Sequence, residues 1–171
     1  MPKAGELAVR SPADGAALLS LATDNAGSID AKINAAHAAQ QQWSRLGRGQ
    51  RAQLLETLSA AVRQQREHLA ELITLEGGKT RKEALAEADG AADIIPRTIK
   101  DASLPEFGGM LRTKERLPVG AVGLITSFNF PLVVAGWTLA PALLAGNAVL
   151  WKPSEKTPLV ALACKAVFNK A

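Results

Sequence analysis

The chain has 171 residues, of which 47% are hydrophobic and 21% are charged, and its formal net charge is +4. These values are those of an ordinary folded protein of one domain, or of one domain with an appendage, and they exclude a low-complexity chain. The single cysteine, Cys164, excludes an internal disulfide and favours a reducing, cytoplasmic compartment.

Neither a membrane nor a nucleic acid is expected as a partner. The longest apolar run, residues 132–144, is shorter than the ~20 residues that span a bilayer. The densest basic group consists of Arg45, Arg48, Arg51, Arg63 and Arg66. It has no interleaved aromatic residues, so a solvated helix face is favoured over a nucleic-acid patch.

The N-terminal third predicts a hairpin followed by helices. Residues 6–10 and 16–21 predict two short strands around the turn-forming sequence Ser-Pro-Ala-Asp-Gly. Ser28 offers an N-cap for an alanine-rich helix that runs to about Leu46. His37 lies in this helix without a second ligand at i+3 or i+4, so no metal site is expected there.

Two further helices are predicted before residue 104. Residues 51–75 carry an apolar stripe with a period of 3.6 and end at Leu-Glu-Gly-Gly-Lys. Thr80 predicts the N-cap of a third helix that ends near Ile95, before Pro96. Glu83 and Glu87 share one face of it and could form an acid–base or metal pair. Without a partner histidine they are expected to face solvent instead.

The C-terminal part predicts a βαβ unit. Residues 110–117 alternate charged and uncharged side chains, as in an exposed edge strand. Residues 121–125 predict a strand buried on both faces. A helix of about four turns is expected from Pro131 to Leu144, with a kink at Pro141. Residues 148–151 predict a second strand, and a last helix starts near Thr157-Pro158. The fold class is therefore α/β, with ligands expected beyond the carboxyl ends of the strands.

The first of two polar clusters at those ends is Ser127–Asn129. It lies just before a helix N-terminus, where free backbone N–H groups and the helix dipole favour negative charge. Asn129 adds a neutral amide donor suited to a carbonyl oxygen that becomes an oxyanion. The alternative is that Asn129 only caps the helix.

The second cluster contains Lys152 and Glu155. An acid at the end of the second strand of a dinucleotide fold binds the adenosine ribose hydroxyls, and its charge favours NAD over NADP. The alternative is a turn with a surface ion pair. The glycine fingerprint G-x-G-x-x-G is missing from the first turn, so a bound cofactor needs an atypical pyrophosphate contact.

The motifs P-V-G-A-V-G-L-I-T-S-F-N-F-P and G-W-T-L-A-P-A-L-L-A-G-N-A-V-L-W-K-P-S-E-K-T-P resemble the aldehyde dehydrogenase superfamily. The resemblance covers the chain from about Glu6 onward and corresponds to the first third of a family member. The S-F-N-F-P and G-W segments are most similar to the aminoadipic-semialdehyde (piperideine-carboxylate) dehydrogenases. Phe128 replaces a tryptophan of many members.

The resemblance implies an NAD(P)-dependent oxidation of an aldehyde to a carboxylic acid, with Asn129 as the oxyanion-hole amide. It implies that the cofactor, NAD or alternatively NADP, is bound by Ile125, Thr126, Ser127, Phe128, Lys152, Pro153, Ser154 and Glu155. It also implies a substrate tunnel lined by Phe130, Val134 and Trp137, and a homo-oligomer, dimer or tetramer, as the complete enzyme.

The resemblance further implies that the nucleophilic cysteine and the general base lie downstream of residue 171. The parts expected are a hairpin (1–22), a helical segment (28–103), an oligomerisation-type strand (111–117) and the start of a Rossmann-like sheet (118–171), without the catalytic domain. Cys164 lies in an apolar helical stripe and is expected to be a buried residue. The chain is thus expected to be an inactive N-terminal fragment. The alternative is a non-catalytic fragment that binds nucleotides or other subunits.

Overall fold

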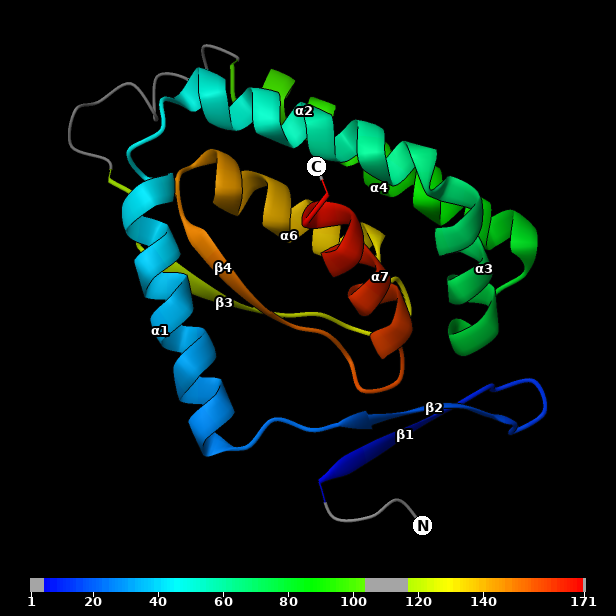
Figure 1. Ribbon diagram of the computed structural model, residues 1–171. Helices are drawn as coiled ribbons and strands as arrows, with labels where there is room; N and C mark the ends of the chain where they lie inside the picture. Colours follow the sequence, from blue (N-terminus) through cyan, green and yellow to red (C-terminus); the bar gives the residue numbers. More distant parts are fainter. Residues whose placement is uncertain (1–4, 104–116, 171) are drawn as a thin grey trace.

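The computed structural model describes residues 5–103 and 117–170 of the chain, and these residues form an α/β fold as predicted (Figure 1). The elements in chain order are β1 (Glu6–Arg10), β2 (Ala17–Ala22), α1 (Ala26–Trp43), α2 (Arg48–Gln64), α3 (Arg66–Gly77), α4 (Arg81–Asp101), β3 (Ala121–Ile125), α6 (Val133–Leu144), β4 (Ala148–Lys152) and α7 (Pro158–Phe168). None of these helices is long and apolar enough to cross a membrane. Residues 110–116 lie outside the described residues, so the edge strand expected there stays a prediction.

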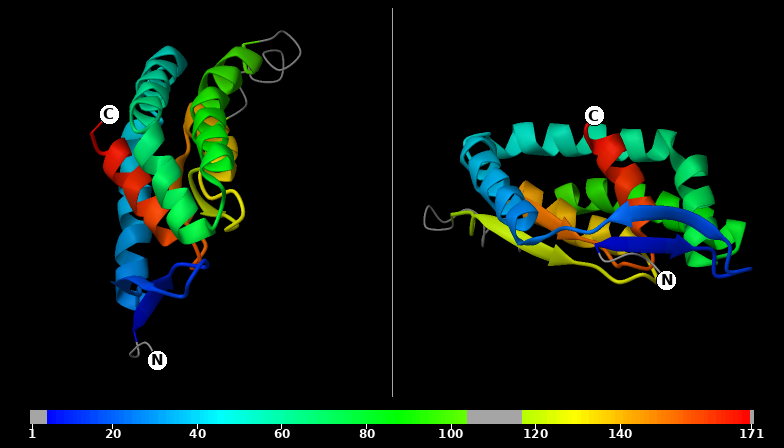
Figure 2. Two further views of the ribbon diagram at one scale, coloured as in Figure 1. Left: turned by 90° about the vertical axis from the view of Figure 1, so that its right-hand side faces the viewer. Right: turned by 60° about the horizontal axis from the view of Figure 1, so that its bottom comes forward.

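The predicted hairpin is confirmed. Strands β1 and β2 pair antiparallel and extend from one end of the helical body (Figure 2). Their connecting loop reaches α3, where Gly78 ends the helix with a φ of 71°. A Cβ atom on Gly78 would lie 2.9 Å from Cγ of Pro12. Gly78 therefore serves both as the left-handed C-cap and as the point of contact with the hairpin loop.

Several helix boundaries differ from the prediction. Helix α1 begins at Ala26, because Asn25 and not Ser28 is the N-cap; the Asn25 side chain accepts a hydrogen bond from the Ser28 amide, and the Ser28 hydroxyl accepts one from the Asn25 amide. The single helix predicted for residues 51–75 is two helices. Gln65, with a ψ of 12°, separates α2 from α3, and the chain changes direction there (Figure 1).

Helix α4 continues through Pro96 to Asp101, so the prediction that it ends at Ile95 is wrong. A proline in a helix leaves the carbonyl oxygen four residues earlier without its amide donor. That carbonyl belongs to Ala92, and the buried Ser59 hydroxyl of α2 donates to it over 2.7 Å. The side chain of a neighbouring helix thus replaces the missing bond and stabilises the helix across the proline.

Substitution Ser59→Ala should therefore lower the free energy of unfolding by about 1–3 kcal/mol, because it leaves the buried carbonyl of Ala92 unpaired. In a Pro96→Ala background the restored amide supplies a donor, and the same substitution should cost clearly less. Urea unfolding of the two single variants and the double variant measures this coupling. Equal costs in the two backgrounds would contradict the explanation.

The βαβ unit is confirmed. Strands β3 and β4 are parallel, with Ala121 opposite Ala148 and Ile125 opposite Lys152. Helix α6 between them begins at Val133 rather than at Pro131, and it contains Pro141. The prediction that β3 is buried on both faces is wrong for the described residues. Ile125 is 78% exposed, because in the described residues β3 belongs to a sheet of two strands and has a neighbouring strand, β4, on one side alone.

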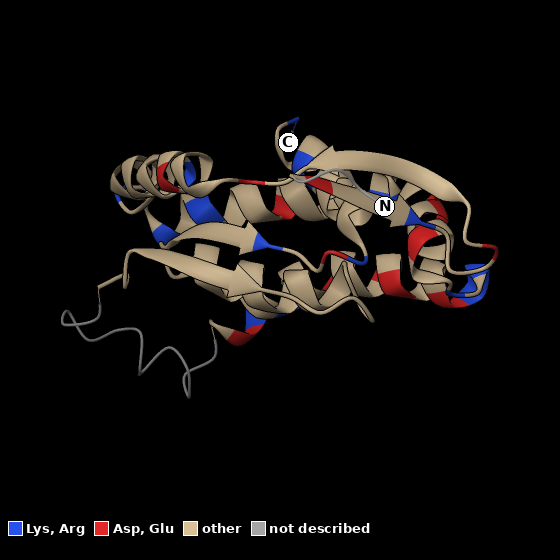
Figure 3. Ribbon diagram, turned by 90° about the horizontal axis from the view of Figure 1, so that it is seen from below, with Lys and Arg blue, Asp and Glu red and all other residues tan. Residues whose placement is uncertain are grey.

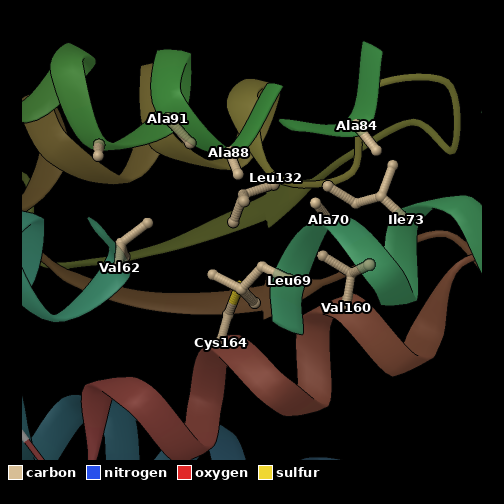
Figure 4. Packing of buried hydrophobic residues seen from close by; sticks show 11 residues of the cluster. Val62, Leu69, Ala70, Ile73, Ala84, Ala88, Ala91, Leu132, Val160 and Cys164 are labelled. Atoms are coloured by element: carbon tan, nitrogen blue, oxygen red, sulfur yellow. The ribbon is translucent and has the colours of Figure 1, made fainter. Parts of the chain in front are cut away.

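The main hydrophobic core joins the helical segment to the βαβ unit (Figure 4). Leu69 and Ile73 of α3 and Val160 of α7 are completely buried in it, beside a row of alanines on α4. The small side chains of α4 allow α6 to lie close, and Cβ on Gly136 of α6 would be 3.6 Å from the carbonyl oxygen of Ala91. Burial of these side chains is the dominant stabilisation of the fold.

Side chains from α1 and α2 bind the C-terminal end of α6. The side chain of Gln40 donates to the carbonyl of Gly146 (3.0 Å), that of Trp43 to the carbonyl of Leu143 (2.9 Å), and that of Arg51 to the carbonyl of Leu144 (3.0 Å). The last carbonyls of a helix have no partner within it, and a cation there is favourable. Gly146, at a φ of 95°, turns the chain into β4. The N-terminal helices therefore hold α6 in place at this end.

Candidate functional site

The two predicted polar clusters lie side by side at the carboxyl ends of β3 and β4. The Thr126 amide donates to the Lys152 carbonyl over 3.3 Å, and the Trp151 indole donates to the Thr126 hydroxyl over 2.9 Å. Beyond the strands, the Lys156 ammonium lies 4.5 Å from the centroid of the Phe128 ring. The parallel register thus brings two segments that are 25 residues apart in sequence to the same edge of the sheet.

The first cluster is open to solvent. Thr126 is buried, whereas Ile125, Ser127, Phe128 and Asn129 are exposed. The alternative that Asn129 is the N-cap of α6 is wrong, since the cap position is Leu132 and no side chain of a neighbouring residue caps the helix. Asn129 therefore precedes the helix and is exposed to solvent.

Glu87 of α4 satisfies the first amides of α6. Its Oε1 accepts hydrogen bonds from the amides of Leu132 (2.9 Å) and Val133 (3.3 Å), and its Oε2 accepts one from Lys79 Nζ (2.5 Å). The prediction that Glu87 faces solvent is wrong: the residue is 4% exposed. Glu83, one turn earlier, is exposed and completes the capping box of α4 with the confirmed N-cap Thr80.

Glu76 plays the same part for α7. It is 4% exposed, and its carboxylate oxygens accept hydrogen bonds from the amides of Leu159 and Val160, both over 2.7 Å. Burial raises the pKa of Glu76 to about 7, against the opposing effect of the two amide hydrogen bonds. The carboxylate is therefore a stabilising partner for the helix and a costly charge to bury.

Helices α6 and α7 thus each have a buried carboxylate at the N-terminus. The expectation that free amides at the start of α6 favour a bound anion is wrong for Leu132 and Val133, because Glu87 already occupies them. The same holds for Leu159 and Val160 of α7. A dinucleotide pyrophosphate would need donors other than these four amides, which agrees with the missing glycine fingerprint.

The second cluster presents an ionised carboxylate. Lys152 Nζ lies 3.5 Å from Glu155 Oε2, and both side chains are more than 60% exposed. The pKa of Glu155 is lowered by its own backbone N–H and then by the charge of Lys152. Pro153 is half-buried, and the buried Ser154 hydroxyl accepts the Lys156 amide over 3.2 Å. The turn and ion pair named as the alternative are present, and they leave the carboxylate accessible as an acceptor.

The three residues expected to line a tunnel follow one face of α6. Phe130, Val134 and Trp137 are spaced i, i+4 and i+7, and the Val134 amide donates to the Phe130 carbonyl over 3.2 Å. Phe130 is 45% exposed and Trp137 61% exposed, while Val134 is half-buried. The Lys79 ammonium lies 3.5 Å from the centroid of the Phe130 ring. This apolar face is continuous with the turn that carries Asn129.

Cys164 is the buried residue that its apolar stripe predicts. It is 1% exposed within the core, and burial raises the pKa of its thiol to about 12, with Glu76 and Glu87 adding to the effect. A thiol of this kind is almost wholly protonated near neutral pH and is unsuited to nucleophilic attack. Among the described residues there is also no group of three or more histidine, cysteine or acidic side chains that could hold a metal ion.

Cationic residues of the described helices lie close to acidic ones. Figure 3 shows the cationic and acidic residues interspersed over the helices. Arg63 pairs with Asp93 (2.7 Å) and Arg66 with Asp89 (2.6 Å), each across the interface of two helices. Arg51 binds carbonyl oxygens, as described above. The interpretation as a solvated helix face is supported for Arg63 and Arg66, whereas Arg51 is partly buried.

Sequence reasoning missed the residues that hold the strands and helices carrying the two polar clusters. Asn147 accepts a hydrogen bond from the Gly120 amide (3.1 Å) and donates to the Ala142 carbonyl (3.1 Å), which ties the start of β3 to the end of α6. Glu76, Lys79 and Glu87 were also assigned no role. The available signal was their chemistry: a carboxylate next to a helix terminator or on an alanine-rich helix face needs a partner if it is buried.

Comparisons with known proteins agree on one family. A family model described as "Aldehyde dehydrogenase family" matches residues 1–171. The chain is 36% identical over 166 residues to a 3,6-anhydro-alpha-L-galactose dehydrogenase of Streptomyces coelicolor, covering 93% of this chain and 34% of that protein. It is 39% identical over 162 residues to an N-succinylglutamate 5-semialdehyde dehydrogenase of Caulobacter vibrioides, again covering 34% of the relative. The chain thus spans about a third of the length of these curated relatives.

Solved structures show the same fold. A glyceraldehyde-3-phosphate dehydrogenase of Bacillus halodurans, in complex with NADP, has a TM-score of 0.87 and 28% identity, covering 98% of this chain and 38% of that one. PnpE in complex with nicotinamide adenine dinucleotide has a TM-score of 0.86 and 29% identity, covering 97% and 36%. The neighbours therefore include proteins solved with either nicotinamide cofactor.

Proposed function

Because the chain belongs to the aldehyde dehydrogenase family, we propose that it forms the cofactor-facing part of an NAD(P)-dependent enzyme that oxidises an aldehyde to a carboxylic acid. The observation that carries the proposal is the meeting of the two polar clusters at one sheet edge, where Ile125 lies opposite Lys152. Ligands of open parallel sheets bind at this edge. Both relatives named above are dehydrogenases by their names, and the second is named for a semialdehyde.

Asn129 would supply the oxyanion donor. Its side chain is exposed, and Glu87 already caps the helix that follows, so the amide is not needed for folding at that position. A neutral amide keeps its donor at every working pH, and a preorganised donor stabilises the charge that forms on the aldehyde oxygen. Phe130, Val134 and Trp137 would hold the apolar part of the aldehyde next to it.

The residues fit a nicotinamide dinucleotide. Glu155 is ionised and exposed, so its carboxylate can accept hydrogen bonds from two ribose hydroxyls. Lys152 and Ser154 flank it, and the backbone of residues 125–128 would line the nicotinamide side. When bound, the cofactor supplies the acceptor for the hydride. The carboxylate favours NAD over NADP, because a 2′-phosphate would lie against its negative charge.

The remaining assignments follow the same proposal. The buried thiol of Cys164 is not a nucleophile, so the 171-residue chain alone should not reduce NAD in the presence of an aldehyde. Such reduction by the purified chain would contradict this. The part of the molecule that the chain represents would be the N-terminal part of the cofactor-binding domain of a cytoplasmic homo-oligomer, and the piperideine-carboxylate branch stays a prediction.

Calorimetry with NAD tests the cofactor site on the chain itself. We expect measurable binding that Glu155→Ala weakens about 10- to 100-fold, because hydrogen bonds to a charged acceptor are lost. Glu56→Ala, which removes an exposed carboxylate from α2, is the matched control and should leave the affinity unchanged. Equal losses in both variants would point to a general charge effect, and the absence of any binding would contradict a preformed half-site.

A further inference from the structure

We propose that Lys79 and Glu87 are positioning residues for the oxyanion turn, residues 127–132, and that they set where the Asn129 amide points. The inference rests on the proposed function, since it gives Asn129 the role of the donor. The contacts that Lys79 and Glu87 make in this turn are with Phe130, Leu132 and Val133. They act through the residues on the C-terminal side of Asn129.

Glu87 fixes the end of the turn. One carboxylate oxygen binds the amides of Leu132 and Val133 at 2.9 and 3.3 Å, and the other binds Lys79 Nζ at 2.5 Å. The side chain of Glu87 is 1% exposed, so these bonds have little competition from water. The position of the first α6 amides is therefore determined by a side chain of α4.

Lys79 fixes the middle of the turn. Its ammonium lies 3.5 Å from the centroid of the Phe130 ring while it is paired with Glu87. A cation over an aromatic face is attracted to it, more strongly where water is excluded, and the Lys79 side chain is only 18% exposed. One ammonium thus connects Phe130 with the carboxylate that binds Leu132 and Val133.

Lys79 and Glu87 also restrict Pro131, which lies between Phe130 and Leu132. Pro131 is buried and has a fixed φ, so once Phe130 and Leu132 are held the backbone between them has little freedom. Asn129 is the next residue outward and is bonded directly to Phe130. Packing alone does not need charges here, because apolar side chains of similar volume commonly stabilise a fold as well as a buried ion pair. The specific contribution of the pair is orientation.

Nuclear magnetic resonance of the 171-residue chain tests the proposal. In the unmodified chain the ε-methylene protons of Lys79 should be shifted upfield by the ring current of Phe130, and Phe130→Leu, at an exposed ring, should remove that shift. Lys79→Met should move the Asn129 side-chain amide signals and lower the hydrogen-exchange protection of the Leu132 and Val133 amides about tenfold. Lys79→Arg should restore both. Arg63→Met, which breaks an exposed ion pair with Asp93, is the matched control and should change neither.

Three results would overturn the proposal: Lys79 ε-methylene signals without an upfield shift, Asn129 signals unchanged in Lys79→Met, or no restoration by Lys79→Arg. The first uses the unmodified chain, so it remains decisive if Lys79→Met does not fold. None of these measurements involves NAD or an aldehyde. A failure here is therefore distinguishable from a failure of the proposed function, which the calorimetry reports.

Discussion

Substitution Glu87→Leu should lower the free energy of unfolding by about 3–5 kcal/mol, as expected when one partner of a buried ion pair is removed. The change leaves Lys79 without its carboxylate and the amides of Leu132 and Val133 without an acceptor. A leucine fills the space but cannot accept a hydrogen bond. Urea unfolding followed by circular dichroism measures the loss.

Glu83→Ala is the control on the same helix. Glu83 is exposed and serves only the capping box of α4, so its removal should cost about 1 kcal/mol or less. The two carboxylates are one helical turn apart and chemically identical, and they differ in burial and in their hydrogen-bond partners. A difference between the two losses of stability is therefore assigned to these two properties. A cost for Glu87→Leu no larger than that for Glu83→Ala would show that the buried contacts of Glu87 contribute little.

The second large effect is a dependence of stability on pH that arises from Glu76. Burial raises its pKa from 4.5 to about 7, so between these values the folded state binds a proton that the unfolded state has released. Stability contributed by this residue therefore falls as pH rises through that window, by about 3 kcal/mol in total, and is constant above it. Denaturant unfolding at about pH 5 and about pH 8 measures the difference.

Glu76→Gln removes the ionisable group but keeps an oxygen that can accept an amide of α7. Its stability should therefore vary much less than that of the unmodified chain over the same window. The carboxylates whose pKa is lowered, such as Asp89 and Glu83, lose their contribution at lower pH and do not mask the effect. A pH dependence that is unchanged in Glu76→Gln would assign it to other groups.

The elements that local chemistry specifies could be predicted from the sequence. The turn-forming sequence at residues 11–15 identified the hairpin, the pattern of period 3.6 identified helical structure, and Thr80 was correctly placed as an N-cap. The parallel βαβ unit was identified as well. The edge of the sheet where Thr126 and Lys152 meet follows from parallel pairing alone. The roles of the site residues remain proposals, but the side-by-side position of the two clusters was predictable.

What could not be predicted depends on partners far away in the sequence. Pro96 stops an isolated helix, and α4 continues with the help of the Ser59 hydroxyl, which lies 33 residues before the Ala92 carbonyl that it binds. Glu87 looks like a surface residue among alanines and charged neighbours, and its burial depends on amides 45 residues later. Burial of β3 was overestimated, because a run of Val, Leu and Ile indicates a strand that can be covered and does not specify what covers it.

The contacts at the two ends of α6 also bear on how the chain folds. The side chains that bind this helix, Trp43, Arg51 and Glu87, are synthesised before the backbone atoms they bind, and the sequence separation of these hydrogen bonds runs from 45 to 100 residues. Contacts of such range slow folding, because a long loop must close before they form. During synthesis the helical segment therefore exists for a time before α6 is made, and the side chains of Arg51 and Glu87 are then hydrated. Helices α6 and α7, which are made later, complete the burial of groups that α1 to α4 carry.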